Sequence, residues 1–200
     1  MSQYIMQVME ILGTIAFAMS GAYVAIQHKM DILGVVMLGM TTAVGGGIIR
    51  DLLIGQTPPV SLQNPLYALI AVGVSLIMFI PALRTHVPMD SGWMVLIDAV
   101  GLGAFTVVGC DAALAYNNLP MQLFLGVLTG VGGGVLRDIF TARPPVIFVK
   151  NFYALASLSG AVVYSLLLPA GGSLATICGI LVTIVLRLLA ARYHWHLPRA

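Results

Sequence analysis

Charged side chains are scarce in this sequence, since Lys, Arg, Asp and Glu make up only 8% of its 200 residues. A soluble domain of ordinary composition carries about 25% charged residues, which keep its surface in water. This scarcity excludes a soluble domain as a substantial part of the chain. The net charge of +2 is also too small and too scattered to indicate a nucleic-acid partner.

Cysteines and closely spaced metal ligands are scarce as well. The two cysteines, Cys110 and Cys178, lie in apolar segments, which excludes a disulfide framework. His194 and His196 form a close pair, but we interpret them as part of a solvated tail and expect neither a metal nor a cofactor. The sequence has no Ser/His/Asp or Cys/His set. Neither of its glycine runs is followed by the Lys-Ser or Lys-Thr of a phosphate loop, so we do not expect an enzyme.

Apolar residues make up 60% of the chain, and the mean hydropathy is +1.01. Residues 1–10 contain no Lys or Arg, so we expect the first apolar stretch to stay in the membrane and not to be a cleaved signal. A transmembrane helix needs about 20 mainly apolar residues. The sequence therefore predicts an all-α membrane protein, a single transmembrane domain with seven spans over residues 5–26, 32–54, 65–83, 93–115, 120–140, 152–169 and 173–191.

The basic residues are distributed unevenly between the two sides of such a protein. Eight of them lie on the side of the C-terminus: Lys29, Arg84, Arg137, Arg143, Lys150, Arg187, Arg192 and Arg199. Only Arg50 lies on the side of the N-terminus. Because Lys and Arg collect on the cytoplasmic side, we predict a multi-pass protein of the inner (plasma) membrane with its N-terminus outside and its C-terminus in the cytoplasm.

One segment of the sequence is duplicated. Residues 39–51 read GMTTAVGGGIIRD and residues 126–138 read GVLTGVGGGVLRD, with eight of thirteen positions identical. The match extends upstream, where Glu10 lies opposite Asp98, and downstream, where Tyr67 lies opposite Tyr153. Each copy holds three spans, an odd number, so the second copy enters the membrane from the opposite side. We predict two inverted repeats, about 5–83 and 93–169, plus a seventh helix at about 173–191, with the functional site where the repeats meet.

Each copy carries three consecutive glycines about two-thirds along a span. They are Gly45, Gly46, Gly47, Gly132, Gly133 and Gly134. Every glycine costs a helix interior roughly 1 kcal/mol relative to alanine. Two interpretations stay open: a kinked, broken helix whose freed carbonyls face a water-filled path, or a stripe of small residues that lets helices pack closely.

Charged pairs follow the glycines by one helical turn, at Arg50-Asp51 and Arg137-Asp138. Ionisable residues inside a span usually face the protein interior, because they cost about 2.5–3.5 kcal/mol on insertion scales. Adjacent residues do not face each other on a helix, so we expect each pair to find partners elsewhere. The alternative is that these groups cap or snorkel at helix ends.

Further polar residues fall within the predicted spans. Asp111 belongs to span four, and we expect it mid-way down that span. Thr42 and Thr129 are matched in the repeats and either bond freed carbonyls or fill space. Glu10 and Asp98 lie nearer the starts of their spans, where we expect an interfacial location.

The two Gly-Gly-Gly-x-x-Arg-Asp copies in inverted units resemble the prokaryotic trimeric intracellular cation (TRIC) channel family, whose bacterial members are also labelled glycine-transporter domain proteins. The resemblance runs from about Leu12 to Pro198. It implies a homotrimer in the lipid bilayer with one pore per protomer, lined by the glycine-kinked second and fifth helices, and permeation by monovalent cations, chiefly potassium. This chain departs from the family at Ala112, where relatives often have Lys, so the resemblance implies no Lys-dependent gating here.

A passive cation channel is our leading interpretation. The alternative is a secondary transporter for a small zwitterion such as glycine, because inverted repeats with broken helices are equally typical of transporters.

The predicted orientation is testable by labelling. A cysteine introduced near Asn117 should react with an impermeant thiol reagent added outside intact cells, whereas a cysteine near His28 should not. The opposite pattern would overturn the assigned orientation and the sides given to Arg50 and Arg137.

Overall fold

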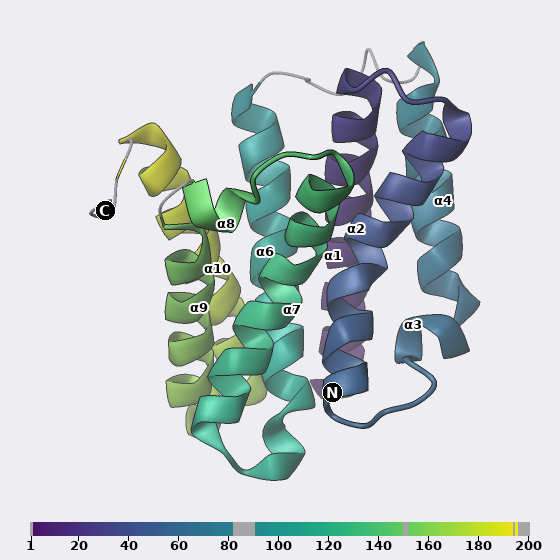
Figure 1. Ribbon diagram of the computed structural model, residues 1–200. Helices are drawn as coiled ribbons and strands as arrows, with labels where there is room; N and C mark the ends of the chain where they lie inside the picture. The colour runs from purple at the N-terminus through teal and green to yellow at the C-terminus, as the bar shows by residue number, and fades with distance from the viewer. Residues whose placement is uncertain (1, 82–90, 150–151, 194, 196–200) are drawn as a thin grey trace.

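The computed structural model describes residues 2–81, 91–149, 152–193 and 195, and these ranges contain only helices and the turns that connect them (Figure 1). The long helices are α1 (Ser2–Gln27), α2 (Ile32–Leu53), α4 (Pro65–Phe79), α6 (Ser91–Ala112), α7 (Leu119–Phe140), α9 (Tyr153–Leu167) and α10 (Gly172–Arg192). The short elements are α3 (Val60–Gln63), α8 (Val146–Val149) and the 3-10 turns η1 (Leu114–Tyr116) and η2 (Leu168–Ala170). The predicted all-α fold with seven spans is confirmed.

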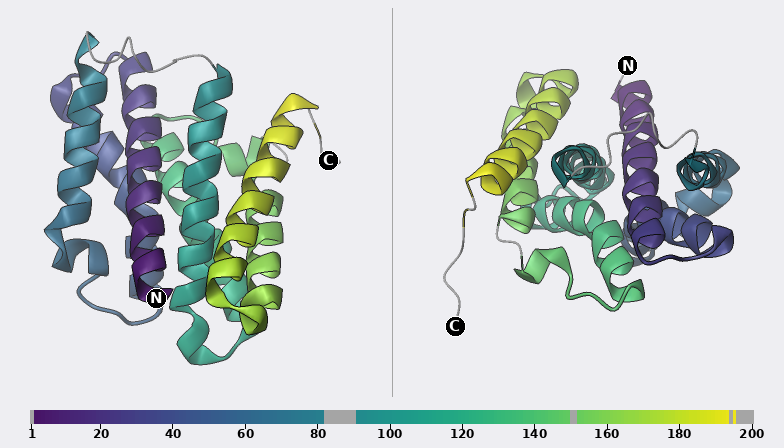
Figure 2. Two further views of the ribbon diagram at one scale, coloured as in Figure 1. Left: turned by 180° about the vertical axis from the view of Figure 1, so that it is seen from behind. Right: turned by 90° about the horizontal axis from the view of Figure 1, so that it is seen from above.

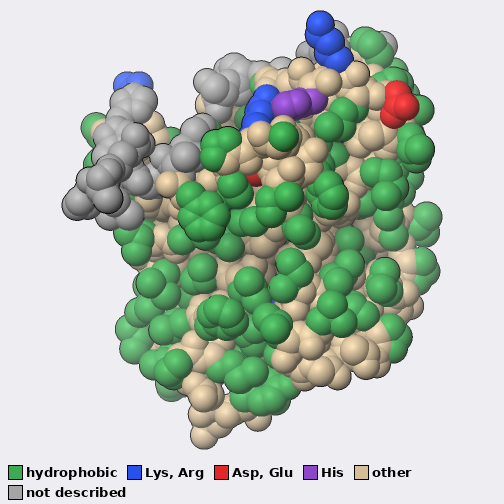
Figure 3. Space-filling model, in the orientation of Figure 1, with side chains coloured by type: hydrophobic (Ala, Val, Ile, Leu, Met, Phe, Trp, Pro, Cys, Tyr) green, Lys and Arg blue, Asp and Glu red, His purple; other side chains and the backbone are tan. Residues whose placement is uncertain are grey.

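The composition of the helices and of their outer surface is that of a multi-pass membrane protein. Within the described ranges six helices are long and apolar enough to cross a bilayer, and α4 is shorter, with 15 residues. Large apolar side chains such as Leu69 on α4, Leu166 on α9 and Leu181 on α10 are exposed. Hydrophobic side chains cover most of the face seen in Figure 3, and the charged side chains visible there gather near one end.

Some predicted features lie outside the described residues. These are the end of the third span at 82–83, the loop with Arg84 and His86, Lys150, and the tail with His194, His196, Pro198 and Arg199.

Four helices form the centre of the bundle, in which α1 packs on α2 and α6, while α7 packs on α6 and α2. Helix α4 covers α1 and α2 on one side, and α9 and α10 cover α6 and α7 on the other (Figure 2). The short helices α3 and α8 lie toward opposite ends of the bundle (Figure 1). The two three-helix repeats are therefore inverted, and α10 has no counterpart in the first repeat.

Polar residues at the loops start several helices. Asp31 caps α2 by accepting a hydrogen bond from the Gly34 amide at 2.8 Å, and Asn118 caps α7 through the Met121 amide at 3.1 Å. Asn64 caps α4 in the same way, ahead of Pro65. Such caps satisfy amides that have no partner within the helix, so these short polar residues define where the apolar spans begin.

The triple glycines lie within continuous helices, because α2 and α7 run without interruption through Gly45–Gly47 and Gly132–Gly134. The expected break with freed carbonyls was therefore wrong. The glycines instead bring two backbones together: a Cβ atom on Gly133 would overlap the Thr42 carbonyl oxygen, and one on Gly46 would overlap the Thr129 carbonyl oxygen. We call this contact the glycine crossing. It joins the two repeats at the centre of the bundle.

The matched threonines bond within their own helices. The Thr42 hydroxyl donates to the Leu38 carbonyl at 2.7 Å, and the Thr129 hydroxyl donates to the Leu125 carbonyl at 2.6 Å. Hydroxyls that bond to the carbonyl four residues earlier often bend a helix slightly. Both hydroxyls are therefore satisfied without any freed carbonyl.

The glycine crossing predicts that alanine destabilises the protein at Gly133 but not at Gly47. Gly133→Ala should destabilise the protein by about 1–3 kcal/mol, because its methyl group overpacks against backbone that cannot move aside. Gly47→Ala is the matched control, since the nearest atom to its added Cβ would be Arg50 Nη2 at 3.9 Å. The unfolding temperatures of the purified variants in detergent test this. Equal destabilisation by both substitutions would contradict a packing role confined to the crossing.

Candidate functional site

Matched polar residues of the two repeats form two clusters on either side of the glycine crossing. The first-repeat cluster comprises Glu10 of α1, Arg50 and Asp51 of α2, and Tyr67 of α4. The second-repeat cluster comprises Asp98 of α6, Arg137 and Asp138 of α7, and Tyr153 of α9. These residues correspond one to one in the duplicated sequence.

Each arginine pairs with the aspartate next to it. Arg50 Nη2 lies 2.7 Å from Asp51 Oδ1, and Arg137 Nε lies 2.9 Å from Asp138 Oδ1. The expectation that neighbours would not face each other was wrong, because the long arginine side chain turns back along the helix end. All four side chains are almost fully buried, with at most 5% of each residue exposed.

The aspartates of these pairs also hold the short helices in place. Asp51 Oδ2 accepts a hydrogen bond from the Val60 amide at 2.9 Å, and Asp138 Oδ2 accepts one from the Val146 amide at 2.8 Å. Val60 and Val146 are the first residues of α3 and α8. Each charged pair therefore does find a partner elsewhere, as expected, and ties the end of a glycine-containing helix to the loop that follows it.

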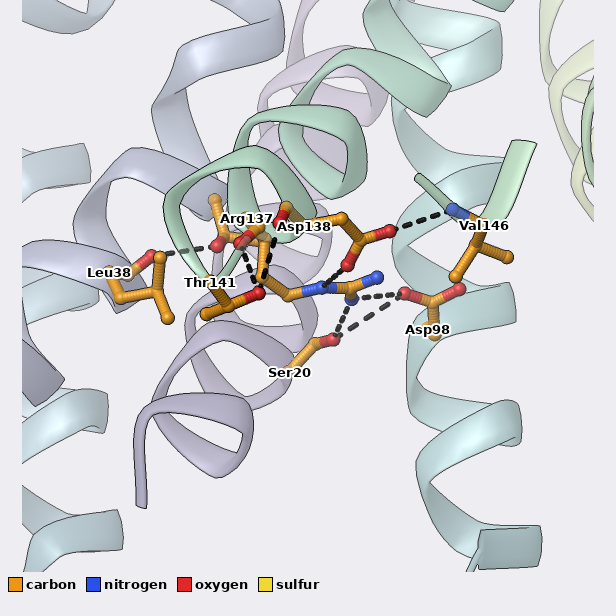
Figure 4. A network of polar contacts seen from close by, with 8 residues as sticks. Ser20, Leu38, Asp98, Arg137, Asp138, Thr141 and Val146 are labelled. Carbon is orange, nitrogen blue, oxygen red and sulfur yellow. Dashed lines mark hydrogen bonds and ion pairs between the residues drawn. The ribbon is translucent and has the colours of Figure 1, made fainter. Parts of the chain in front are cut away.

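In the second-repeat cluster, Arg137 bonds to residues of two other helices (Figure 4). Its Nη1 donates to Ser20 Oγ at 2.6 Å and lies 3.0 Å from Asp98 Oδ1. These bonds connect α7 to α1 and α6. Asp98 is only 8% exposed, because the arginine stabilises the carboxylate inside the bundle. The interfacial depth expected for Asp98 stays a prediction.

Helix α10 adds a second arginine to this cluster. Arg187 is 5% exposed, and its guanidinium carbon lies 5.1 Å from the centre of the Tyr153 ring, a cation–π arrangement. The second-repeat cluster thus contains two arginines and two aspartates and has no net charge when all four are ionised.

In the first-repeat cluster Glu10 takes the position of Asp98, and its contacts differ. Glu10 accepts a hydrogen bond from the Tyr67 hydroxyl, and among the described residues no arginine forms an ion pair with it. A cavity of about 30 Å³ lies beside these groups. Its lining is made of polar residues, one glycine, the ion pair of α2 and three apolar side chains: Glu10, Thr14, Ser61, Tyr67, Gly47, Arg50, Asp51, Ala43, Val44 and Val60.

The surroundings of the third glycine in each triplet also differ between the two clusters. A Cβ atom on Gly134 would meet the Tyr153 hydroxyl at 3.3 Å, whereas Gly47 borders the cavity and has only Arg50 Nη2 near it. Ser61 Oγ also borders the cavity and is buried without a hydrogen-bond partner in the structure.

Asp111 lies apart from both clusters. It is the second-to-last residue of α6, so it sits near a helix end and not deep in the span, which corrects the predicted depth. Its Oδ1 accepts a hydrogen bond from the Tyr164 hydroxyl at 2.8 Å, and the residue is half-buried. Asp111 therefore keeps access to the surface of the bundle.

The structure brings most of the predicted site residues together along α2 and α7, with glycines and threonines at the centre and the charged pairs beyond them. Sequence reasoning assigned no site role to Glu10, Tyr67, Asp98 or Tyr153, although the repeat offset had already matched them. It gave no signal for Ser20 or Ser61, since neither has a polar counterpart of its own kind in the other repeat. Arg187 lies within the seventh predicted span, where an ionisable residue is itself a signal of an interior position. Among the described residues no group of three or more His, Cys, Asp or Glu is placed to hold a metal ion.

Comparison with known proteins places similar sequences across nearly the whole chain. A family model described as glycine transporter matches residues 7–82 and 95–169. The UPF0126 inner membrane protein YadS of Escherichia coli K12 is 34% identical over 196 residues, which cover 95% of this chain and 93% of YadS. The UPF0126 membrane protein YvgT of Bacillus subtilis is 36% identical over 197 residues, covering 96% of this chain and 95% of YvgT.

Solved structures share the fold as well. The TRIC trimeric intracellular cation channel orthologue from Rhodobacter sphaeroides has a TM-score of 0.88 and 33% identity, covering 96% of this chain and 99% of that one. A structure described in connection with conductance through TRIC cation channels has a TM-score of 0.87 and 39% identity, covering 97% of this chain and 96% of that one.

The two clusters should respond differently to loss of the matched carboxylate. Asp98→Asn should destabilise the protein by about 3 kcal/mol, because Asp138 then remains as the one carboxylate that balances the buried Arg137 and Arg187 of the cluster. Glu10→Gln should cost less than about 1 kcal/mol, since the amide oxygen still accepts a hydrogen bond from Tyr67.

Thermal unfolding of the purified variants in detergent gives the comparison. The double variant Asp98→Asn, Arg137→Gln should recover part of the loss, because Asp138 and Arg187 then leave the cluster without a net charge. Equal losses for Asp98→Asn and Glu10→Gln would contradict the different pairing in the two repeats.

Proposed function

Since the chain belongs to the glycine-transporter family, whose solved relatives are described as TRIC cation channels, we propose that it is a channel for monovalent cations, chiefly potassium. We further propose one pore in each protomer of a homotrimer, in the inner membrane, with the N-terminus outside. The family relationship and the inverted repeats support this proposal.

One structural observation supports the proposed path: the two glycine-containing helices meet backbone to backbone and have charged pairs toward their ends. Gly46 and Gly133 form this contact, and the clusters of Arg50-Asp51 and Arg137-Asp138 lie beyond it. We assign α2 and α7 as the helices that line the pore. The six glycines form its narrowest part, and Thr42 and Thr129 supply nearby oxygens.

The glycine crossing as it stands leaves no space between the two backbones. Conduction through it requires α2 and α7 to separate, and Gly46 and Gly133 present no side chains of their own at the contact. We therefore assign the structure to a non-conducting state, in which Arg137 holds α7 against α1 and α6.

A secondary transporter for a small zwitterion such as glycine is the second candidate. The description of the matching family favours it, and so do the inverted repeats, which are common among transporters. The two candidates differ in kinetics, because a channel releases its ion without a full conformational cycle for each one.

Recordings from the purified protein in a planar bilayer distinguish the candidates. A channel should give discrete unitary currents, and under a potassium chloride gradient the reversal potential should lie close to the potassium equilibrium value. Saturable glycine uptake without unitary currents would favour the transporter. A reversal potential near that of chloride would reject the cation assignment.

A single substitution tests whether Asp111 contributes to the path. Two unit charges about 4 Å apart attract by about 1 kcal/mol in water, so Asp111→Asn should lower the cation current severalfold if the carboxylate lies at the pore mouth. Asp31→Asn, which removes an exposed charge and keeps the helix cap, should leave the current unchanged. Equal currents in both variants would remove Asp111 from the proposed path.

A further inference from the structure

The two repeats carry the same charged motif, yet among the described residues its charge is compensated only in the second repeat. In the second-repeat cluster, Arg137 pairs with Asp98 and α10 supplies Arg187 through Tyr153. Helix α10 lies outside the duplication and packs against α9 and α6, so it brings no arginine to the first repeat. The two clusters therefore differ because α10, the helix outside the duplicated six, supplies an arginine to the second repeat alone.

This asymmetry leaves the first-repeat cluster with a net negative charge. Arg50 is paired with Asp51, and among the described residues the Tyr67 hydroxyl is the one side-chain group that bonds to the Glu10 carboxylate. With its side chains ionised, the cluster contains two carboxylates and one guanidinium. A carboxylate next to low-dielectric protein is costly without a counter-ion, which favours a bound cation beside it.

The space beside Glu10 has the size and the chemistry for such an ion. The cavity of about 30 Å³ exceeds the roughly 10–15 Å³ that one water molecule requires on the same measure. Its wall includes the Ser61 hydroxyl, which is buried and has no partner in the structure, and the Thr14 hydroxyl, which keeps a free lone pair while donating to the Glu10 carbonyl at 2.7 Å. Carboxylate and hydroxyl oxygens are ligands for hard cations such as potassium and sodium.

We propose that the first-repeat cavity binds one monovalent cation, held by the Glu10 carboxylate with Ser61 Oγ as a further ligand. This site rests on the proposed function and extends it, because it binds the cation on one side of the glycine crossing. The stoichiometry follows from charge: one monovalent ion neutralises the cluster, whereas a divalent ion would leave it positive. Gly47 keeps the site open, since a side chain there would point into the cavity.

Equilibrium binding tests the site without any measurement of current. In the purified protein in detergent, the unfolding temperature should rise as potassium chloride replaces N-methylglucamine chloride at constant ionic strength, because an ion that binds only the folded state stabilises it. Glu10→Gln should abolish this rise. Asp31→Asn is the matched control: it removes one exposed carboxylate while keeping the cap of α2, and it should retain the full rise.

Two further variants keep the proposal testable even if Glu10→Gln fails to fold. Ser61→Ala should raise the potassium concentration for half-maximal stabilisation by about tenfold, the equivalent of one lost ligand of about 1.4 kcal/mol. Gly47→Ala should weaken the effect by filling the cavity. An unchanged potassium response in these variants, or a wild-type protein that responds to pH but not to potassium, would overturn the site.

The failure of this site and the failure of the channel are distinguishable. Potassium-dependent stabilisation that requires Glu10 supports the site even in a protein that gives no unitary currents. Unitary cation currents together with a potassium response that survives Glu10→Gln would support the channel and reject the site.

Discussion

The close approach of α2 and α7 is the contact on which the arrangement of the bundle depends. At Gly46 and Gly133 a single added carbon would strike the backbone of the other helix, so no other residue fits without moving the two repeats apart. Glycine lowers helix propensity by about 1 kcal/mol, but a segment within a membrane has no water to compete for its backbone hydrogen bonds. Both helices therefore remain continuous, and the cost of the glycines is offset by close packing.

The charged pairs are arranged around this contact in a way that a membrane interior requires. A buried arginine or aspartate is stable only when its charge is compensated and its hydrogen bonds are made. Arg137 meets this condition with Asp138, Asp98 and Ser20, which come from three different helices. The residues that compensate the charge of Arg137 thus also join α1, α6 and α7. In the second repeat the same network of bonds therefore balances charge and holds the helices together.

Duplication produced two clusters of the same residue types, and the seventh helix made them unequal. Arg187 balances the second cluster, whereas Glu10 in the first cluster lies beside a cavity. An inverted repeat alone would give both sides of the membrane equivalent sites. The added helix provides a physical reason for the two ends of the proposed path to differ, with one end compensated by arginines and the other negative.

The sequence by itself determined the helices and their duplication. Runs of about 20 apolar residues located the seven spans, because the bilayer sets that length. The offset between Glu10 and Asp98, and between Tyr67 and Tyr153, already marked the members of the two clusters. Only the tertiary structure decided what these residues do. The short helices α3 and α8, with four residues each, are too short to give a hydropathy signal, yet they supply the amides that the aspartates bind.

The dependence on tertiary contacts also explains the expectations that were wrong. Whether three glycines break a helix or bring two helices together depends on what lies opposite them, and Gly133 has the Thr42 carbonyl there, 91 positions away in the chain. Whether Asp98 is buried or exposed depends on Arg137 reaching it from another helix. Local composition predicts which segments enter the membrane, because hydration is a property of each segment. Pairing between distant segments is a property of their packing, and packing is decided only when the whole chain has folded.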